Sequence, residues 1–257
     1  MAYSTCMTPS NPSRRPVSPF TWIGIIVAIL ATLLAVSSGF GTRFGWWPFP
    51  TGLRLLWIAG YAGLAAAILS LIGAIKSRPS TGRAGLMRSI VGFTIGCAIA
   101  GILGIWVLTA KRVPMIHDIS TDLENPPPFV AILARRKDAP NPSAYGGPEV
   151  KAKQRAGYPN LGPLTLTVPP DEAFRRALDA ARRMGWELVS YNEPEGRIEA
   201  TDTTFWFGFK DDVVVRVTAF PGGSRIDVRS VSRVGRSDVG TNARRIASYL
   251  KHIDRRS

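Results

Sequence analysis

The sequence predicts three membrane-spanning helices followed by an α+β domain, in which an antiparallel sheet packs against two helices on one face. The first observation is the distribution of charge. Residues 1–117 contain ten Lys and Arg and no Asp or Glu, whereas all 18 acidic residues lie from Asp118 onward, together with 22 cations. The second observation is three uncharged apolar stretches in the first half. The third is a succession of strand and helix periodicities in the second half.

The net charge of +14 therefore belongs mostly to the first half of the 257 residues. This distribution excludes a nucleic-acid-binding protein, because such a protein carries its positive surface on its folded domain. Cys6 and Cys97 are the only cysteines, which excludes a fold held together by several disulfides. We expect an N-terminal tail over residues 1–19, a three-helix membrane region over 20–112 and a soluble domain over 113–257.

Each apolar stretch is long enough to cross a bilayer. The expected spans are 20–40, 55–75 and 89–110, each bounded by Lys or Arg. About 20 helical residues cover the hydrocarbon layer. Soluble helices are apolar on one face only, whereas these stretches are apolar all round, which favours membrane spans.

Small residues recur every fourth position in the second and third spans. Such stripes let helix backbones approach closely in lipid and predict a compact three-helix hairpin, although Gly and Ala are also common in membrane helices generally. The residues are Ala59, Gly63 and Ala67, then Gly92, Gly96, Ala100 and Gly104. No charged residue or His lies inside a span, which argues against a transporter or pump.

The short loops predict the orientation. Six cations lie on the side of the N-terminal tail and four on the other side, which favours a cytoplasmic N-terminus. The aromatic segment 43–50 is typical of a membrane interface on the exported side. We therefore expect a multi-pass protein of the bacterial inner membrane with a periplasmic C-terminal domain. As an alternative, signal-peptidase cleavage after the small residues 35–37 would leave two spans, and the domain would be cytoplasmic if the remaining topology flipped.

The second half has clear local signals. Residues 116–163 are rich in turn residues, and Leu164–Val168 alternates as a strand does. A helix is expected from Asp171 to a C-terminal cap at Gly185. Strands are expected over 186–191, 197–203, 212–220 and 225–231, separated by short turns that favour antiparallel pairing. The last helix is expected over 239–253, with Asp238 and Thr241 as candidate caps.

Several segments of the second half together resemble one family. They are Ile116–Asp122, Pro126–Phe129, Gly196–Asp202, Trp206–Val213 and Asp227–Gly235. The chain from about Pro114 to Ile253 is similar to the domain of unknown function 1499 family. That resemblance implies a fold unit in the cell envelope and supplies no catalytic residues.

A catalytic site would have to use His117, Asp118 and Asp122, in a hydrolase-like or metal-assisted reaction. The domain has two His and no Cys, so we expect no zinc site, and the acids do not have the spacing of a calcium loop. In the simpler interpretation these side chains bind backbone N–H groups in turns. We expect no cofactor and favour a non-enzymatic protein.

The best candidate ligand site is a cationic loop before the last helix, where free N–H groups favour an anion. Its residues are Arg233, Gly235, Arg236, Ser237 and Gly240. The alternative is that Asp238 simply caps the helix.

Trp206 and Gly208 define a second candidate, an apolar groove. If the segment is extended, Phe205, Phe207 and Phe209 share one face, which we expect to pack in the core. The paired arginines at 135–136, 175–176, 182–183, 244–245 and 255–256 are expected on solvated faces, where they would also attract anionic lipid. The expected partners are the bilayer and an envelope protein or anionic lipid.

Overall fold

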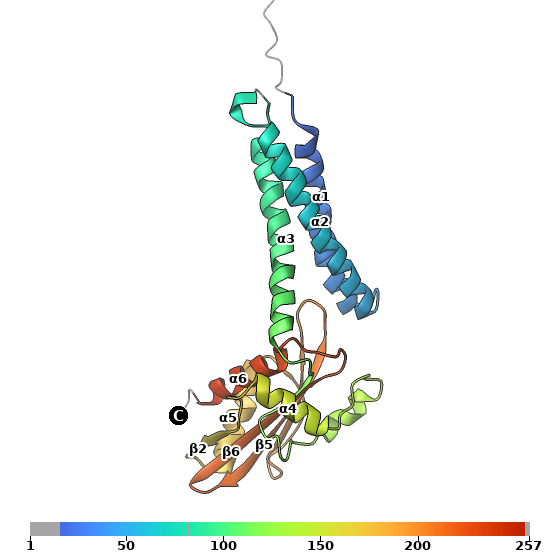
Figure 1. Ribbon diagram of the computed structural model, residues 1–257. Helices are drawn as coiled ribbons and strands as arrows, with labels where there is room; N and C mark the ends of the chain where they lie inside the picture. The colour runs from blue at the N-terminus through green and yellow to red at the C-terminus, as the bar shows by residue number, and fades with distance from the viewer. Residues whose placement is uncertain (1–15, 82, 255–257) are drawn as a thin grey trace, which may run out of the picture. The chain divides into compact units, whose positions relative to one another are not determined.

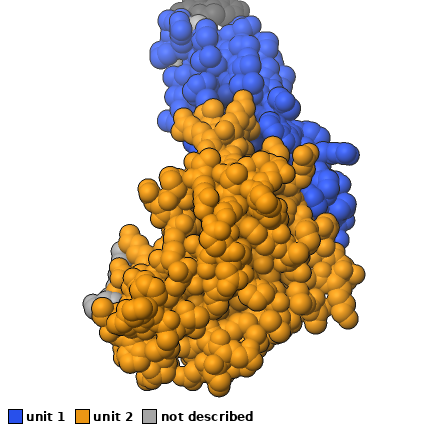
Figure 2. Space-filling view, turned by 60° about the horizontal axis from the view of Figure 1, so that its bottom comes forward, with its two compact units in different colours: residues 1–105 blue, residues 106–257 orange. Residues whose placement is uncertain are grey.

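The computed structural model describes residues 16–81 and 83–254. The chain divides into two compact units, residues 1–105 and 106–257, coloured separately in Figure 2 and described one at a time below. Most of the expected tail, 1–15, lies outside the described residues, as do Arg255 and Arg256.

The three predicted helices begin in the first unit, and the last of them continues into the second (Figure 1). They are α1 (Pro19–Arg43), α2 (Phe49–Lys76) and α3 (Leu86–Arg112), with a short 3-10 helix, η1, over Pro79–Thr81. Their lengths of 25, 28 and 27 residues and their apolar composition suffice to cross a membrane. Each helix is a few residues longer than its expected span, because the helix continues into the flanking cations.

Glycine allows the helices to approach closely. A Cβ on Gly24 of α1 would lie 2.4 Å from the Ser70 hydroxyl of α2, and one on Gly96 of α3 would lie 2.5 Å from the Gly63 carbonyl oxygen. Only part of the expected stripe on α3 packs against another helix, however. Gly92 and Gly96 are buried, whereas nothing lies within 4 Å of a Cβ on Gly104. The prediction that the whole stripe packs is therefore wrong for Gly104.

The second unit contains an antiparallel sheet in the order β1-β6-β5-β4-β3, with β2 also paired to β6 (Figure 1). The strands are β1 (Asp118–Ser120), β2 (Leu164–Leu166), β3 (Glu187–Asn192), β4 (Arg197–Thr203), β5 (Lys210–Phe220) and β6 (Gly223–Ser232). The predicted antiparallel α+β architecture is confirmed.

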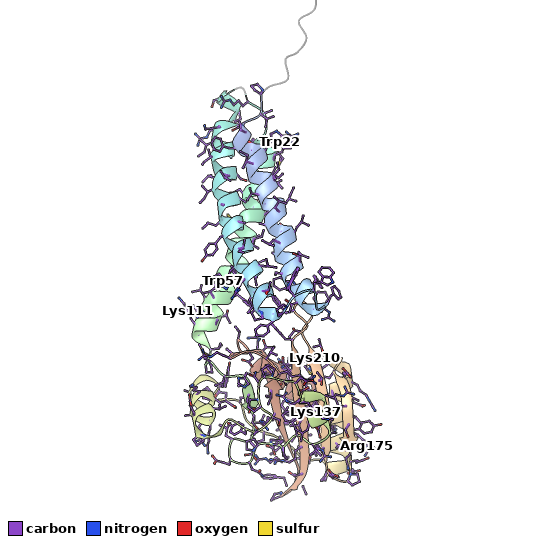
Figure 3. All side chains as sticks on the ribbon, turned by 90° about the vertical axis from the view of Figure 1, so that its right-hand side faces the viewer. Trp22, Trp57, Lys111, Lys137, Arg175 and Lys210 are labelled. Carbon is purple, nitrogen blue, oxygen red and sulfur yellow. The ribbon has the colours of Figure 1, made fainter. Side chains whose placement is uncertain are left out.

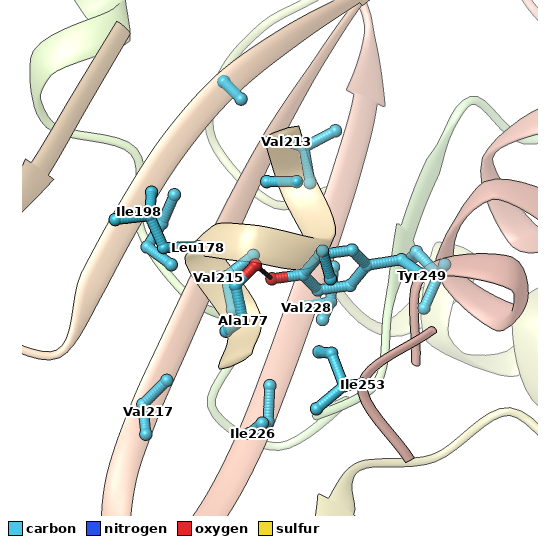
Figure 4. Close-up of a cluster of buried hydrophobic side chains, with 14 of the residues drawn as sticks. Ala177, Leu178, Ile198, Val213, Val215, Val217, Ile226, Val228, Tyr249 and Ile253 are labelled. Carbon is cyan, nitrogen blue, oxygen red and sulfur yellow. Dashed lines mark hydrogen bonds between the residues drawn. The ribbon is translucent and has the colours of Figure 1, made fainter. Parts of the chain in front are cut away.

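Helices α5 (Pro170–Arg183) and α6 (Thr241–Asp254) cover one face of this sheet. Valine and isoleucine side chains from β4, β5 and β6 pack against both helices, as Figure 4 shows. Tyr249 of α6 is fully buried, stacks on Trp186 at 4.8 Å and donates a hydrogen bond to the Ala177 carbonyl oxygen of α5 (2.9 Å). This contact ties the two helices together in the centre of the core.

The helix ends follow the local signals. Gly185 ends α5 with a φ of 72°, which favours glycine, and the N–H of Trp186 reaches back to Ala181. The Asp238 carboxylate accepts the N–H groups of Gly240 and Asn242, each at 2.8 Å, and so caps α6 as predicted.

The segment expected to be rich in loops contains more structure than predicted. It includes β1, the 3-10 helix η2 (Ala131–Arg136) and helix α4 (Gly147–Gly157). Gln154 of α4 exchanges two hydrogen bonds with the Ser120 backbone, at 3.0 and 2.6 Å. The polar α4 has no apolar period to predict it, and this tertiary contact holds it at the edge of β1.

Candidate functional site

The face of the sheet opposite α5 and α6 carries charged side chains. Alternation along β6 places Arg225, Asp227 and Arg229 on this face, while Ile226 and Val228 enter the apolar core. We call this face, with the residues of segment 118–146 that bind to it, the polar layer. Its charges form four groups.

Asp118 and Arg229 form the first group. Arg229 Nε and Nη2 donate to the two carboxylate oxygens at 2.9 and 2.8 Å, and both side chains are buried. Nη2 also donates to the Ser143 carbonyl oxygen at 2.9 Å. The guanidinium lies 5.1 Å from the Phe129 ring and 5.5 Å from the Tyr145 ring, within the range of cation–π attraction. Asp118 is thus fully occupied in a structural ion pair.

Asp212 is the centre of the second group. It accepts hydrogen bonds from Arg136 Nη1 (2.5 Å), from Arg233 Nε and Nη2 (2.8 Å each) and from the Thr201 hydroxyl (2.8 Å). The hydrogen bond to Asp212 raises the pKa of the Arg233 guanidinium above its ordinary value. Arg233, predicted to clamp an anion, therefore binds a carboxylate of its own chain.

Asp122 is held in the third group by two arginines, Arg216 (2.9 Å) and Arg225 (3.2 Å). Its other oxygen accepts the N–H groups of Glu124 and Asn125. Partial burial opposes ionisation, but the backbone N–H groups and the arginines together hold the pKa of Asp122 below its ordinary value. Asp122 is therefore a stable anion.

Glu199 forms the fourth group beneath η2. Its buried carboxylate accepts the N–H groups of Val130, Ala131 and Ile132, at 2.9 to 3.2 Å, and Arg197 Nε lies 3.0 Å away. A carboxylate at the N-terminus of a helical turn accepts hydrogen bonds from N–H groups that have no partner within the turn. This contact fixes segment 118–146, which covers this face of the sheet, to β4. We call it the covering segment.

The structure does not assemble the predicted catalytic set. Asp118 and Asp122 bind arginines four residues apart on β6, about 13 Å along the strand. His117 lies just before β1, and its backbone carbonyl accepts the Ser232 N–H (3.0 Å) and Asn242 Nδ2 (3.0 Å). Within 16–81 and 83–254, no group of three or more His, Cys, Asp or Glu residues is arranged to hold a metal ion.

Two of the paired arginines are not solvated. Arg136 and Arg245 are only 6 % and 5 % exposed. Arg245 of α6 binds Asp211 (2.5 Å) and Asp202 (2.7 Å), which joins the helix to β4 and β5. The prediction of solvated faces is wrong for these two residues, because acids distant in sequence meet them in the fold.

The loop between β6 and α6 contains the other predicted anion-binding residues. Arg236 is exposed, while the Ser237 hydroxyl accepts the Val239 N–H (3.2 Å) and the Gly235 carbonyl accepts Asn141 Nδ2 (2.9 Å). Gly240 lies beside the capping Asp238 carboxylate. Burial raises the pKa of Asp238, although the N–H groups that it accepts oppose the change. Anion binding by this loop remains a prediction.

The aromatic segment is a turn between β4 and β5. The N–H of Thr204 donates to the Phe209 carbonyl (2.9 Å), and Gly208, with a φ of 68°, donates to the Thr204 carbonyl (3.0 Å). Phe207 is buried and stacks on Phe209, whereas Phe205 is 78 % exposed. The three phenylalanines therefore do not share one face, because the segment is not extended.

These two loops are neighbours. The Arg233 N–H donates to the Lys210 carbonyl (3.0 Å), which joins the start of one loop to the end of the other. Figure 3 labels Lys210, whose side chain is exposed. The start of β1 lies at the same end of the sheet, since Asp118 pairs with Val231 and Asp211 with Ser232. We call this end, formed by residues 117–118, 204–210 and 233–240, the entry edge.

Sequence reasoning missed most of the polar layer, including Arg136, Glu199, Asp212 and Arg229. One signal was available: alternating charged and apolar residues at 225–229, where a solvated strand face is the usual interpretation. The covering segment that buries these charges could not be recognised from its own composition.

Comparison with known proteins gives one match. No curated protein and no solved structure is significantly similar to the chain. A family model described as "Protein of unknown function (DUF1499)" matches residues 118–253. The match begins at the first residue of β1, ends in the last turn of α6 and covers more than half of the chain. The chain therefore belongs to the DUF1499 family of proteins of unknown function.

Proposed function

We propose that this protein is a membrane-anchored, non-enzymatic binding protein of the bacterial inner membrane, which holds its α+β domain against the periplasmic surface of the bilayer. The observation that carries the proposal is the short connection between α3 and β1. Only five residues separate Arg112, the last residue of α3, from Asp118, the first residue of β1. A domain on so short a connection works at the membrane surface.

The charge of the loops supports the orientation. Six cations, which lie in the N-terminal tail, between α2 and α3 and at the facing ends of these two helices, would lie in the cytoplasm, against four on the other side. Cytoplasmic loops carry an excess of Lys and Arg, because cations are retained there during insertion. With three spans, the C-terminal domain then lies in the periplasm.

The polar layer supports binding over catalysis. A general base needs a carboxylate or imidazole within reach of substrate. Asp118 and Asp122, the acids of the enzyme hypothesis, each bind arginine side chains of the same fold. The exposed residues at the entry edge, Phe205, Lys210 and Arg236, are instead of types that contact lipid or protein surfaces.

Reporter fusions at the C-terminus test the location of the domain. We expect alkaline phosphatase fused after Ser257 to be active in bacterial cells and green fluorescent protein at the same position to be dark. The reverse pattern would place the domain in the cytoplasm and overturn the proposed orientation.

Thermal melts of the full chain in detergent test binding against catalysis. We expect a higher melting temperature with soluble short-chain phosphatidylglycerol, because a ligand that binds only the folded state stabilises it. We expect no shift with divalent cations, and His117→Ala should leave the lipid response unchanged. A divalent-cation shift that Asp122→Asn abolishes would favour a metal-assisted enzyme instead.

A further inference from the structure

The turn between β4 and β5 presents aromatic side chains at its tip. Phe205 is 78 % exposed, and Trp206 packs edge-on against the buried Phe207 at 5.0 Å. Phe207 also stacks on Phe209 at 5.3 Å. We call residues 204–209 the aromatic turn. The stacked rings and the hydrogen bonds that Thr204 makes with Gly208 and Phe209 hold the tip in a fixed shape. Phe205 therefore stays at the surface when the domain is folded.

The register of the sheet places this turn at the end where the chain enters the domain. Thr203 pairs with Lys210 on either side of the turn, Asp211 pairs with Ser232, and Val231 pairs with Asp118. Neighbouring strands lie about 4.8 Å apart, so β5 lies about 10 Å from β1 across the sheet. The aromatic turn and the start of β1 therefore belong to one edge.

The connection to α3 keeps this edge near the bilayer. From Arg112 to Asp118 the chain advances by six residues, which span about 20 Å when fully extended. Lys111 and Arg112 at the end of α3 are typical of the headgroup region, where cations accompany the end of a span. If α3 spans the bilayer, this connection limits the distance between Asp118 and the headgroups to about 20 Å.

The chemistry of the aromatic turn fits a lipid interface. Trp is enriched at the level of the headgroups, because its ring is apolar and carries a polar N–H, and an exposed Phe supplies apolar surface beside it. Lys210 follows the turn directly and is exposed, as is Arg236 in the neighbouring loop. Cations at this position attract anionic headgroups.

We infer that the aromatic turn inserts Phe205 and Trp206 into the interface of the same bilayer that α3 spans, with Lys210 and Arg236 against anionic headgroups. This inference rests on the proposed function, because it requires α3 to cross the membrane. It names lipid as the partner of the entry edge. The turn would act as a second attachment point and fix the orientation of the domain on the membrane.

A matched control lies at the other end of the same strand. Phe220 ends β5 in the turn toward β6 and is 45 % exposed. Lys210 and Phe220 are the two ends of the 11-residue strand β5, about 33 Å apart along the strand. An entry edge docked on the membrane leaves Phe220 in water, whereas a sheet lying flat on the membrane would bring both ends to the lipid.

Depth-dependent fluorescence quenching tests the inference. In the full chain with Cys6→Ala and Cys97→Ala, an environment-sensitive bimane is attached through Phe205→Cys or, separately, Phe220→Cys. Each protein is reconstituted into nanodiscs of phosphatidylcholine and phosphatidylglycerol that carry spin-labelled lipid. We expect several-fold stronger quenching at position 205 than at position 220, with a blue-shifted emission. Equal quenching at both positions, or none at 205, overturns the inference.

A charge variant separates the insertion of the aromatic rings from the contact between the cations and the anionic headgroups. We expect Lys210→Glu to reduce quenching at position 205 in nanodiscs with phosphatidylglycerol and to have little effect in phosphatidylcholine alone. Quenching that does not respond to lipid charge would overturn the headgroup contact. The nanodisc results do not depend on which side of the membrane the domain occupies, so they fail separately from the fusion experiment.

Discussion

Arg229 and Asp118 form a buried two-point ion pair, with nitrogen–oxygen distances of 2.9 and 2.8 Å. The pair joins the first strand after the membrane helices to the last strand of the sheet, across 111 residues of sequence. It therefore closes the domain at the point where the chain enters it from α3. Its two charges depend on each other, because either one alone would be buried without a partner.

We expect Asp118→Asn to lower the free energy of unfolding of the domain by about 3–5 kcal/mol, since the Arg229 charge would lose its buried partner. Pulse proteolysis of the detergent-purified full chain in urea measures this change. The control is Glu149→Gln, which removes an exposed pair with Lys153 and should have little effect, because solvent screens that pair. Equal effects of the two substitutions would contradict a buried pair.

The lowered pKa of Asp122 predicts that the domain loses stability in acid. Its pKa lies below the ordinary value, so its contribution is present above the unfolded-state pKa of about 3.9 and is lost as pH falls through the lower folded-state pKa. We expect Asp122→Asn to cost about 1–2 kcal/mol at pH 7. The difference from wild type should shrink as pH falls below about 4 in urea titrations. A difference that persists at the lowest pH would assign the effect to packing.

The raised pKa of Asp238 predicts that its contribution to stability has the opposite pH dependence. Burial raises its folded-state pKa, so the stability gained by protonation in the fold is complete below the unfolded-state pKa and is lost as pH rises through the folded-state value. We expect Asp238→Ala to cost about 1 kcal/mol at pH 7 through the lost cap. The gap between variant and wild type should widen on acidification, as urea midpoints at several pH values would show. A gap that narrows would contradict the effect of burial.

The glycine stripe on α3, which is in close contact at Gly96 and not at Gly104, gives a test inside the first unit. We expect Gly96→Leu to destabilise the helix bundle by about 1–3 kcal/mol, because a side chain there meets the backbone of α2. Gly104→Leu should change the stability by less than about 1 kcal/mol, since nothing lies within 4 Å of its Cβ position. Unfolding of the full chain in increasing dodecyl sulfate measures both. A larger effect at Gly104 would reveal a helix contact there.

Local signals predicted most elements of the fold. Uncharged stretches predicted the three helices, alternation predicted β3 to β6, and Gly185 and Asp238 were recognised as helix ends. Helix α4 was missed because it is polar and depends on the contact between Gln154 and Ser120. The aromatic turn was misjudged because five closely spaced aromatic and glycine residues fit a strand pattern as well as a tight turn.

The sequence by itself determined that this protein has a half with three long apolar helices and a mixed-charge half, because charge and hydropathy act through composition and do not depend on which residues meet. Only the tertiary structure decided the role of the charged residues. Asp122 meets Arg216 across 94 positions, and Asp118 meets Arg229 across 111. An Asp or Arg gives the same local sequence signal whether it is solvated or buried. Only the strand register, together with the segment that covers the sheet, brings its partner within hydrogen-bonding distance. The same register placed the aromatic turn at the edge where the chain enters the domain.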